Sequence, residues 1–116
     1  DLTLTNKRKI HDRADADGMA LDTQGNIWIT GFGRDDIMRL KPDGTELPPV
    51  KSPSGPVTQI RFGGADGRDY YINCVPPGAG LELRDGKPLT EKKSVLLRGR
   101  SEVPGVLIAA ARFKLD

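Results

Sequence analysis

Two side chains in this sequence, Asp17 and Thr58, carry polar groups that could bind or react with a ligand, and both lie where a ligand could reach them. Asp17 lies in Asp17-Gly18-Met19, immediately ahead of a short apolar run that is typical of a strand. A carboxylate at such a point can bind a hard cation through its oxygens or accept a proton from water. An Asp before Gly also occurs simply because its side chain closes a turn onto its own backbone. The residues alone leave both interpretations open.

Thr58 precedes the next comparable strand, 41 positions after Asp17, and its hydroxyl could contact a substrate. The other polar candidates are weaker. Asp15 is expected to be a solvated loop residue, with coordination of a metal through water as the alternative. His11, the sole histidine, is expected at the surface. Cys74 is expected to be a small core residue, because a single thiol cannot form an internal disulfide.

The composition favours many short strands joined by tight turns. The 116 residues include 14 glycines and 9 prolines, which suits a single β-rich domain better than a helical one. The 18 basic and 16 acidic residues nearly cancel, and neither sign forms the concentrated face of a nucleic-acid binder. No apolar run approaches the ~18 residues that span a bilayer. We therefore expect a soluble protein, cytoplasmic or periplasmic, that contacts neither nucleic acid nor a membrane.

Apolar segments of a few residues, each bounded by Gly, Pro, Asp or Asn, predict the strands. They cover residues 4–11, 19–21, 26–30, 36–40, 57–62, 70–75, 80–84, 94–98 and 105–114. The turns that end at Gly25, Gly44 and Gly86 place glycine where a tight hairpin needs positive φ. For the last segment a short helix is the alternative, because three consecutive alanines favour one.

An internal repeat indicates the architecture. The strand, turn and aromatic strand of residues 20–30 recur in residues 60–73, and the 41-residue offset matches the roughly 40–45 residues of a four-stranded propeller blade. In such a blade the first strand lines the central channel and the second carries bulky packing residues, here Trp28 and Tyr71. The sequence therefore predicts an all-β fold, a fragment of a β-propeller with about two to two and a half four-stranded antiparallel blades.

This prediction treats residues 1–116 as one partial domain. Its parts are an outer strand at 4–11, a blade at 18–52, a second blade at 57–98 and a C-terminal strand at 105–114.

The motifs around the candidate residues resemble the gluconolactonase family, which includes regucalcin (senescence marker protein) and related lactonases. The resemblance is carried by Asp17-Gly18-Met19 with the hairpin behind it, by residues 36–44, and by Phe62-Gly63-Gly64 with the aromatic strand at 70–73. It covers about residues 3–75, and it departs from the family at Ala16, where a proline is usual. The chain looks like a C-terminal fragment of such a protein.

The resemblance implies a six-bladed ring that hydrolyses sugar lactones or similar esters with one divalent cation, most commonly Ca²⁺, with Zn²⁺ or Mg²⁺ as alternatives. It implies that Asp17 is a metal ligand and a candidate general base. A cation of this kind polarises a carbonyl and lowers the pKa of a nearby water, whose proton a carboxylate can take. The family's other ligands, a glutamate and an asparagine, have no counterpart in this chain. One carboxylate cannot hold the ion.

Two classes of function remain open. In the first, the chain is part of a metal-dependent lactonase, and the missing blades come from the rest of the protein or from other chains. In the second, it is a non-enzymatic two-blade unit, three copies of which close a ring that binds sugars or proteins. A lone fragment would expose unpaired strand edges and a bare blade face, which disfavours a monomer. Because its one carboxylate ligand cannot hold the ion, the chain by itself is expected to be inactive.

Overall fold

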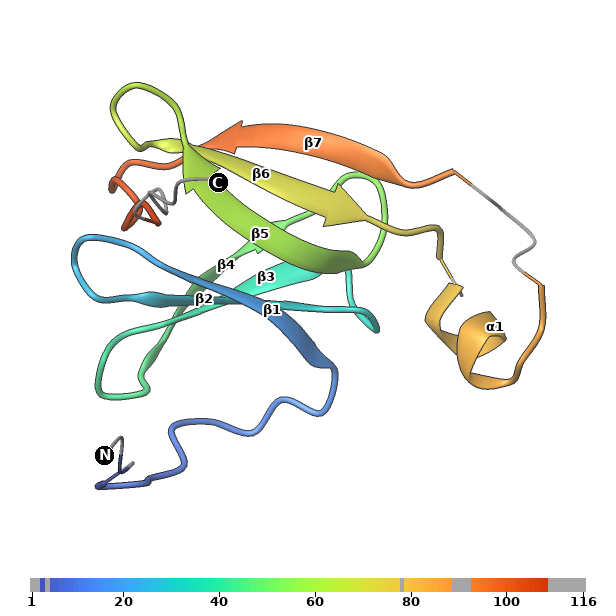
Figure 1. The fold of residues 1–116 in the computed structure, drawn as a ribbon, viewed down its shortest axis with the longest axis horizontal. Helices are drawn as coiled ribbons and strands as arrows, with labels where there is room; N and C mark the ends of the chain where they lie inside the picture. Colours follow the sequence, from blue (N-terminus) through green and yellow to red (C-terminus); the bar gives the residue numbers. More distant parts are fainter. Residues whose placement is uncertain (1–2, 4, 78, 89–92, 109–116) are drawn as a thin grey trace, which may run out of the picture.

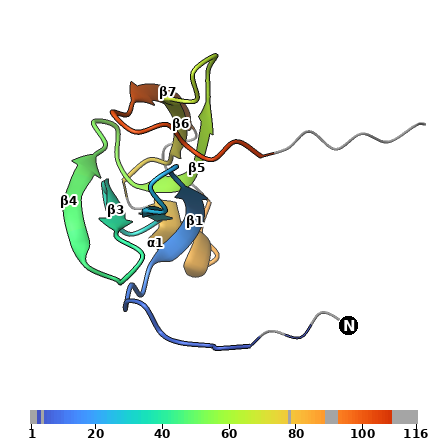
Figure 2. The ribbon, with the colours of Figure 1, turned by 90° about the vertical axis from the view of Figure 1, so that its left-hand side faces the viewer.

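The computed structural model describes residues 3, 5–77, 79–88 and 93–108, and it contains seven strands and one short helix in these ranges. The strands are β1 (Ala16–Leu21), β2 (Ile27–Gly31), β3 (Asp36–Leu40), β4 (Glu46–Lys51), β5 (Val57–Gly63), β6 (Asp69–Cys74) and β7 (Val95–Arg100). Figure 1 shows their succession, and Figure 2 shows β1–β4 and β5–β7 as two separate groups. The predicted all-β propeller fragment is confirmed.

Antiparallel pairing runs in chain order within each group. β1, β2, β3 and β4 form one meander, which we call the first blade, and β5, β6 and β7 form the second blade. A single pair, Gly31 with Val57, joins the two where β2 ends and β5 begins. β1 and β5 begin 41 positions apart, as the repeat predicts. The glycines at 25, 44 and 86 all have positive φ, also as predicted.

The core lies between the two blades. Its buried members come from both: Trp28, Ile37, Val57, Ile60, Ile72 and Cys74. The Trp28 ring meets Phe62 edge-on with centroids 5.2 Å apart, and it lies 5.7 Å from the Tyr70 ring. Burial of each such side chain stabilises the folded state by about 1.5–3 kcal/mol. Tyr70 therefore takes the packing role that the sequence assigned to Tyr71, which points to the opposite face of β6 and is 37% exposed.

Residues 5–11 form no strand, so the predicted outer strand at 4–11 is wrong over its described part. Residues 8–11 instead line a hollow together with Ile27 and Ile29, on the face of the first blade that points away from the core. Arg8 donates to the Pro42 carbonyl at 3.2 Å. Residues 5–11 form no β-ladder, because residues 8–11 lie over this face without pairing with the edge of a strand.

β4 (Glu46–Lys51) was missing from the predicted strands because Pro48 and Pro49 lie within it. Proline cannot donate to a ladder, which confines it to edge strands and bulges. β4 is the outermost strand of the first blade, and its pairing with β3 shifts register at these prolines. The edge position accommodates both residues and completes a four-stranded blade.

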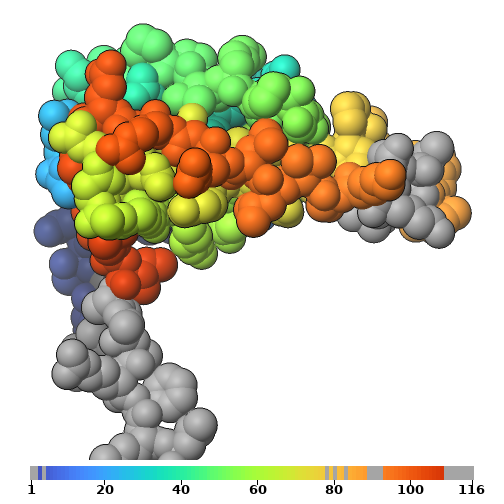
Figure 3. Space-filling model, turned by 90° about the horizontal axis from the view of Figure 1, so that it is seen from above, coloured from blue at the N-terminus to red at the C-terminus, as the bar shows by residue number. Residues whose placement is uncertain are grey.

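The predicted strand at 80–84 is instead the helix α1 (Ala79–Arg84). Its alanine, leucines, glutamate and arginine are strong helix formers, and Glu82 near its start and Arg84 at its end suit the helix dipole. α1 lies at one end of the molecule (Figure 1), and the same end projects to one side in Figure 3. The described part of the chain has no helix that is long and apolar enough to cross a membrane.

After β7 the chain turns back to the first blade. We call residues 101–106 the returning segment. Its Pro104 carbonyl accepts from the Thr23 amide at 2.8 Å, and the Val106 amide donates to the Leu21 carbonyl at 2.8 Å. Of the predicted strand at 105–114, Gly105 makes only an isolated bridge with Asp22 and residues 106–108 are not in a strand. Residues 109–114, and with them the helical alternative, lie outside the described residues.

Candidate functional site

Asp17 occupies a β-bulge at the start of β1. The pairing with β2 shifts register between Ala16 and Met19, so Asp17 and Gly18 lie where β1 carries an extra residue. Bulges re-aim side chains and are frequent beside active sites. The Asp17 side chain is exposed, and within the described ranges nothing hydrogen-bonds to it or forms an ion pair with it. Both carboxylate oxygens are therefore available to a ligand.

Thr58 occupies the equivalent place in β5. The pairing with β6 shifts register between Val57 and Gln59, which puts Thr58 in a second bulge. The half-buried Thr58 hydroxyl donates to the Asn73 carbonyl at 3.4 Å and accepts from Asn73 Nδ2 at 3.1 Å. The one proton of the Thr58 hydroxyl is therefore already used in the hydrogen bond to the Asn73 carbonyl. Thr58 can still offer a lone pair to a hydroxyl of a ligand.

Gly18 brings the two bulges into contact. Its amide donates to Thr30 Oγ1 at 2.9 Å, and Thr30 Oγ1 donates back to the Gly18 carbonyl at 3.2 Å. A Cβ at position 18 would lie 2.8 Å from the Thr58 carbonyl oxygen and 2.5 Å from Gln59 Oε1. Only glycine permits this approach. The structure therefore places Asp17 and Thr58 at the same end of the two innermost strands.

Asp15 is not the solvated loop residue that the sequence predicted. Its Oδ1 accepts from Arg13 Nε at 3.0 Å, its Oδ2 accepts from the Gly33 amide at 3.2 Å, and its carbonyl accepts from the Phe32 amide at 3.2 Å. Two aspartates only two positions apart thus differ completely, because Asp15 is held by the protein and Asp17 is not. No local motif signals this difference, because the partners at 32 and 33 belong to another turn.

The described residues contain no group of three or more His, Cys, Asp or Glu side chains that could hold a metal ion. Ca²⁺ takes six to eight oxygen ligands. Asp17 and its described neighbours therefore do not fit a complete calcium site.

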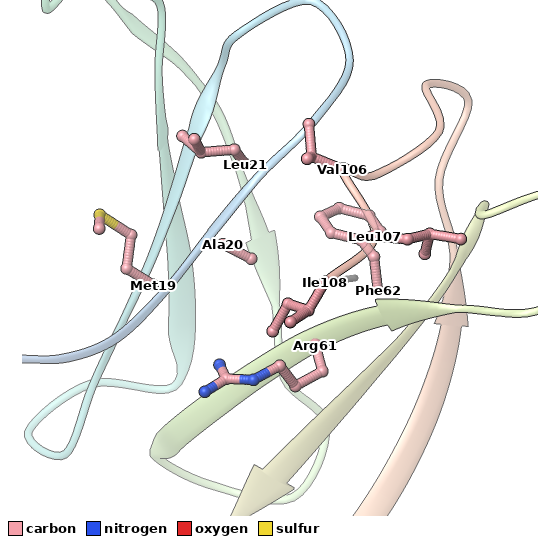
Figure 4. A pocket seen from close by; sticks show the side chains of 8 residues that line it. All are labelled: Met19, Ala20, Leu21, Arg61, Phe62, Val106, Leu107 and Ile108. Atoms are coloured by element: carbon pink, nitrogen blue, oxygen red, sulfur yellow. The ribbon is translucent and has the colours of Figure 1, made fainter. Parts of the chain in front are cut away.

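An apolar cavity of about 470 Å³ lies toward the other end of β1 and β5. It is lined by Met19, Ala20, Leu21, Arg61, Phe62, Val106, Leu107 and Ile108. Figure 4 shows the β1 side chains on one side and those of β5 and residues 106–108 on the other. Arg61 is the one charged residue of this lining, and its Nη1 donates to Gln59 Oε1 at 2.6 Å. The cavity lacks a carboxylate, so Asp17 remains the better candidate for hydrolytic chemistry.

Comparison with known families decides the relationship. The model of the SMP-30/Gluconolactonase/LRE-like region matches residues 1–75. The chain belongs to this family. The match ends just after β6, so it includes both bulges, the core residues of the first blade, and the two hairpins that form the repeat.

Individual proteins of the SMP-30/gluconolactonase family are also similar to this chain. The chain is 33% identical over 90 residues to regucalcin of Danio rerio, covering 73% of this chain and 30% of that protein. It is 33% identical over 89 residues to 6-deoxy-6-sulfogluconolactonase of Pseudomonas putida, covering 77% of this chain and 30% of that protein. The chain thus spans under a third of the length of these relatives.

Two solved structures share the fold. A luciferin-regenerating enzyme superimposes with a TM-score of 0.62 at 27% identity, covering 79% of this chain and 30% of that one. The calcium-binding protein regucalcin of Agrobacterium tumefaciens also gives a TM-score of 0.62, at 22% identity, covering 84% of this chain and 32% of that one. The two-blade arrangement is therefore a portion of a larger propeller fold.

Proposed function

We propose that the protein to which this chain contributes hydrolyses a sugar lactone or a related ester, with Asp17 as the general base. The observation that carries the proposal is the Asp17 carboxylate, which is exposed and without a protein partner among the described residues. It lies in a bulge of an innermost strand, in a family that includes a sulfogluconolactonase. A carboxylate so placed can take the proton of an attacking water.

We also propose that this site holds a divalent cation, with Asp17 as one ligand. Ca²⁺ is favoured over Zn²⁺ or Mg²⁺, because a carboxylate suits a hard cation and a similar fold belongs to a calcium-binding protein. The described residues supply too few ligands for the ion, so the others belong to the blades outside this chain. This chain contributes a single carboxylate and the bulge that directs it.

Thr58 is proposed as a substrate contact. Because its hydroxyl proton is given to the Asn73 carbonyl, Thr58 can only accept a hydrogen bond. A sugar lactone carries several hydroxyl donors, which matches this demand. The contact would orient the ring relative to Asp17 at the neighbouring bulge.

The test is gluconolactone hydrolysis by the full-length protein and its Asp17→Asn variant. Asn keeps the shape of the side chain but cannot take a proton, so kcat/KM should fall by about 10²–10⁴-fold. Asp12→Asn is the matched control, because Asp12 is an exposed carboxylate in the same segment that pairs only with Lys9 in the described structure. An Asp17→Asn protein that retains wild-type activity would refute the proposal.

Metal dependence is tested separately. The wild-type protein should lose activity after treatment with a chelator and regain it on addition of Ca²⁺. Asp17→Asn should bind Ca²⁺ more weakly in calorimetry, since one charged ligand is lost. Full activity in the presence of the chelator would contradict the metal proposal and leave the hydrolase proposal standing.

We propose that the remaining blades come from the same protein rather than from further copies of this chain. Arg8 lies over the open face of the first blade, while Arg98, which is paired with the outward-facing Tyr71, lies on the open face of the second. Copies arranged head to tail would bring these like charges together, which disfavours the contact. Sedimentation of the isolated 116-residue chain checks this, because a stable trimer would support the non-enzymatic ring instead.

A further inference from the structure

We propose that Arg13 is a positioning residue for Asp17, and that it acts by linking the loop before β1 to the first residue of β3. The inference rests on the function proposed for Asp17, because it concerns how that carboxylate is held in place. Arg13 lies four residues ahead of Asp17 and does not reach the site itself. Its effect passes through Asp15 and Asp36.

The Arg13 guanidinium is almost fully buried, with 4% of the side chain exposed. Its Nε donates to Asp15 Oδ1 at 3.0 Å, and its Nη2 donates to Asp36 Oδ1 at 3.0 Å and to the Asp36 carbonyl at 3.4 Å. Both carboxylates are themselves 16% exposed. One planar group thus bridges two carboxylates from different elements, which a lysine could not do with the same geometry.

Asp15 connects Arg13 to the start of β1, because it is also hydrogen-bonded to the residues that follow β2. Its second carboxylate oxygen accepts from the Gly33 amide, and its carbonyl accepts from the Phe32 amide, both at 3.2 Å. On the other side of Asp17, the hydrogen bonds between Gly18 and Thr30 fix the chain again. The Asp17 side chain makes no bond within the described structure, so its direction depends on these two flanking anchors.

The two carboxylates do not depend on Arg13 equally. Asp36 also has Lys51 Nζ at 3.7 Å, which would still neutralise it if Arg13 were removed. Asp15 has Arg13 as its one cationic partner among the described residues. A largely buried carboxylate without its partner is costly, so Asp15 would move toward solvent and release the loop. The anchor before Asp17 is therefore the one that Arg13 controls.

The first experiment is hydrogen exchange, read by mass spectrometry, in the full-length protein and its Arg13→Ala variant. The amides of Phe32 and Gly33, which donate to Asp15, should exchange faster in the variant. The Gly18 amide, which donates to Thr30, should also exchange faster, because the segment that carries it loses the anchor on its N-terminal side. Arg100→Ala is the matched control. Arg100 also bridges two carboxylates, Asp66 and Asp69, but it does so at the opposite end of the second blade. Unchanged exchange at the three amides in Arg13→Ala would overturn the proposal.

The second experiment separates positioning from stability. At a temperature well below the unfolding midpoint, Arg13→Ala should lower kcat by about 10²-fold, the cost of misplacing a reacting group by roughly 1 Å. KM should change by less than about threefold, since Arg13 does not touch substrate. Arg13→Lys should be intermediate, because an ammonium can pair with only one carboxylate at full strength. A lowered midpoint with wild-type kcat would mean that Arg13 is merely structural, and would refute the inference.

If Arg13→Ala does not fold, Asp15→Asn replaces it in both experiments, because that change weakens the same link and leaves Arg13 paired with Asp36. The two proposals fail in different ways. A wild-type protein that hydrolyses no lactone refutes the proposed function, while exchange still decides whether Arg13 fixes the Asp17 segment. An active wild type whose Arg13→Ala and Arg13→Lys forms keep full kcat refutes the positioning role alone.

Discussion

The two hairpin turns of the repeat, between β1 and β2 and between β5 and β6, are stabilised by different interactions. In the first, the Asp22 carboxylate is buried, with 2% of the residue exposed. It accepts from the amides of Gln24 and Asn26, from Asn26 Nδ2 and from Trp28 Nε1, all at 2.9–3.0 Å. In the second, Asp66 is exposed; it accepts from the Arg68 amide at 3.1 Å and pairs with Arg100.

The difference shows that one sequence pattern can be stabilised in two physical ways. The first turn depends on buried hydrogen bonds from uncharged donors, which salt does not screen and which are expensive to break. The second depends on a surface ion pair, which water and salt weaken. Trp28 explains the asymmetry, because its ring packs in the core while its Nε1 reaches Asp22. Tyr70, the core aromatic of the second repeat, has no such donor aimed at its turn.

Asp22→Ala should have the largest effect on the free energy of unfolding. It leaves the Trp28 and Asn26 donors without partners inside the protein, at about 1–3 kcal/mol each. We expect a loss on the order of 3 kcal/mol in urea unfolding of the full-length protein. Asp66→Ala makes the same chemical change in the exposed turn and should shift the midpoint far less. Equal shifts for the two variants would show that the turns do not differ as described.

Trp28→Phe tests the link between the first turn and the core. Phenylalanine keeps an aromatic ring near Phe62 and Tyr70 but removes the Nε1 donor and part of the packed volume. A loss of about 1–3 kcal/mol is expected from the combined hydrogen-bond and cavity terms. In the double variant with Asp22→Ala the losses should be less than additive, because both remove the same bond. Simple additivity would mean that this bond contributes nothing.

The pH dependence of stability tests the hydrogen bonds of the first turn. Burial raises the pKa of Asp22, but the hydrogen bonds from Trp28 and Asn26 outweigh it, so the pKa lies below its ordinary value of 3.8. A carboxyl group whose pKa is lower in the folded state stabilises the fold above its unfolded pKa, and this stability is lost as pH falls through the folded pKa. Wild type should therefore lose stability as the pH falls below about 4, and Asp22→Asn should lose less. Parallel pH curves for the two proteins would contradict this origin.

The smallest effect is expected from salt. At about 1 M salt the screening length is only about 3 Å, so the exposed pair of Arg100 and Asp66 should lose its contribution. The modest destabilisation by Arg100→Ala should therefore vanish in high salt, whereas the effect of Asp22→Ala should persist. If Arg100→Ala destabilised the protein equally at low and high salt, the ion pair of Arg100 with Asp66 would not be a screened surface interaction.

Much of the fold could be predicted because its determinants are local. Trp28, the positive-φ glycines and the 41-residue repeat each reflect short-range turn and strand chemistry, and they predicted the all-β propeller fragment. β4 was missed because its prolines are permitted only by an edge position that the pairing creates. Residues 80–84 alternate like a strand, yet they have high helix propensity and form α1.

The candidate site could be predicted only in part for the same reason. Asp17 and Thr58 stand out through local motifs and spacing, and the structure brings their two bulges together through Gly18. The role of Arg13 depends on Asp36, 23 positions away, and on amides of a turn that carries no matching motif. Such partners become visible only when the blade is assembled.

The returning segment makes the turn between β1 and β2 depend on residues near the end of the described chain. The Thr23 amide donates to the Pro104 carbonyl, and the Leu21 carbonyl accepts from the Val106 amide, so both groups are bonded to a segment that follows the second blade in the chain. Gly105 also packs so closely against the Phe62 ring that no larger residue could take its place. Truncation before residue 101 would remove both of these hydrogen bonds, so the turn between β1 and β2 should be less stable in such a fragment than in the chain described here.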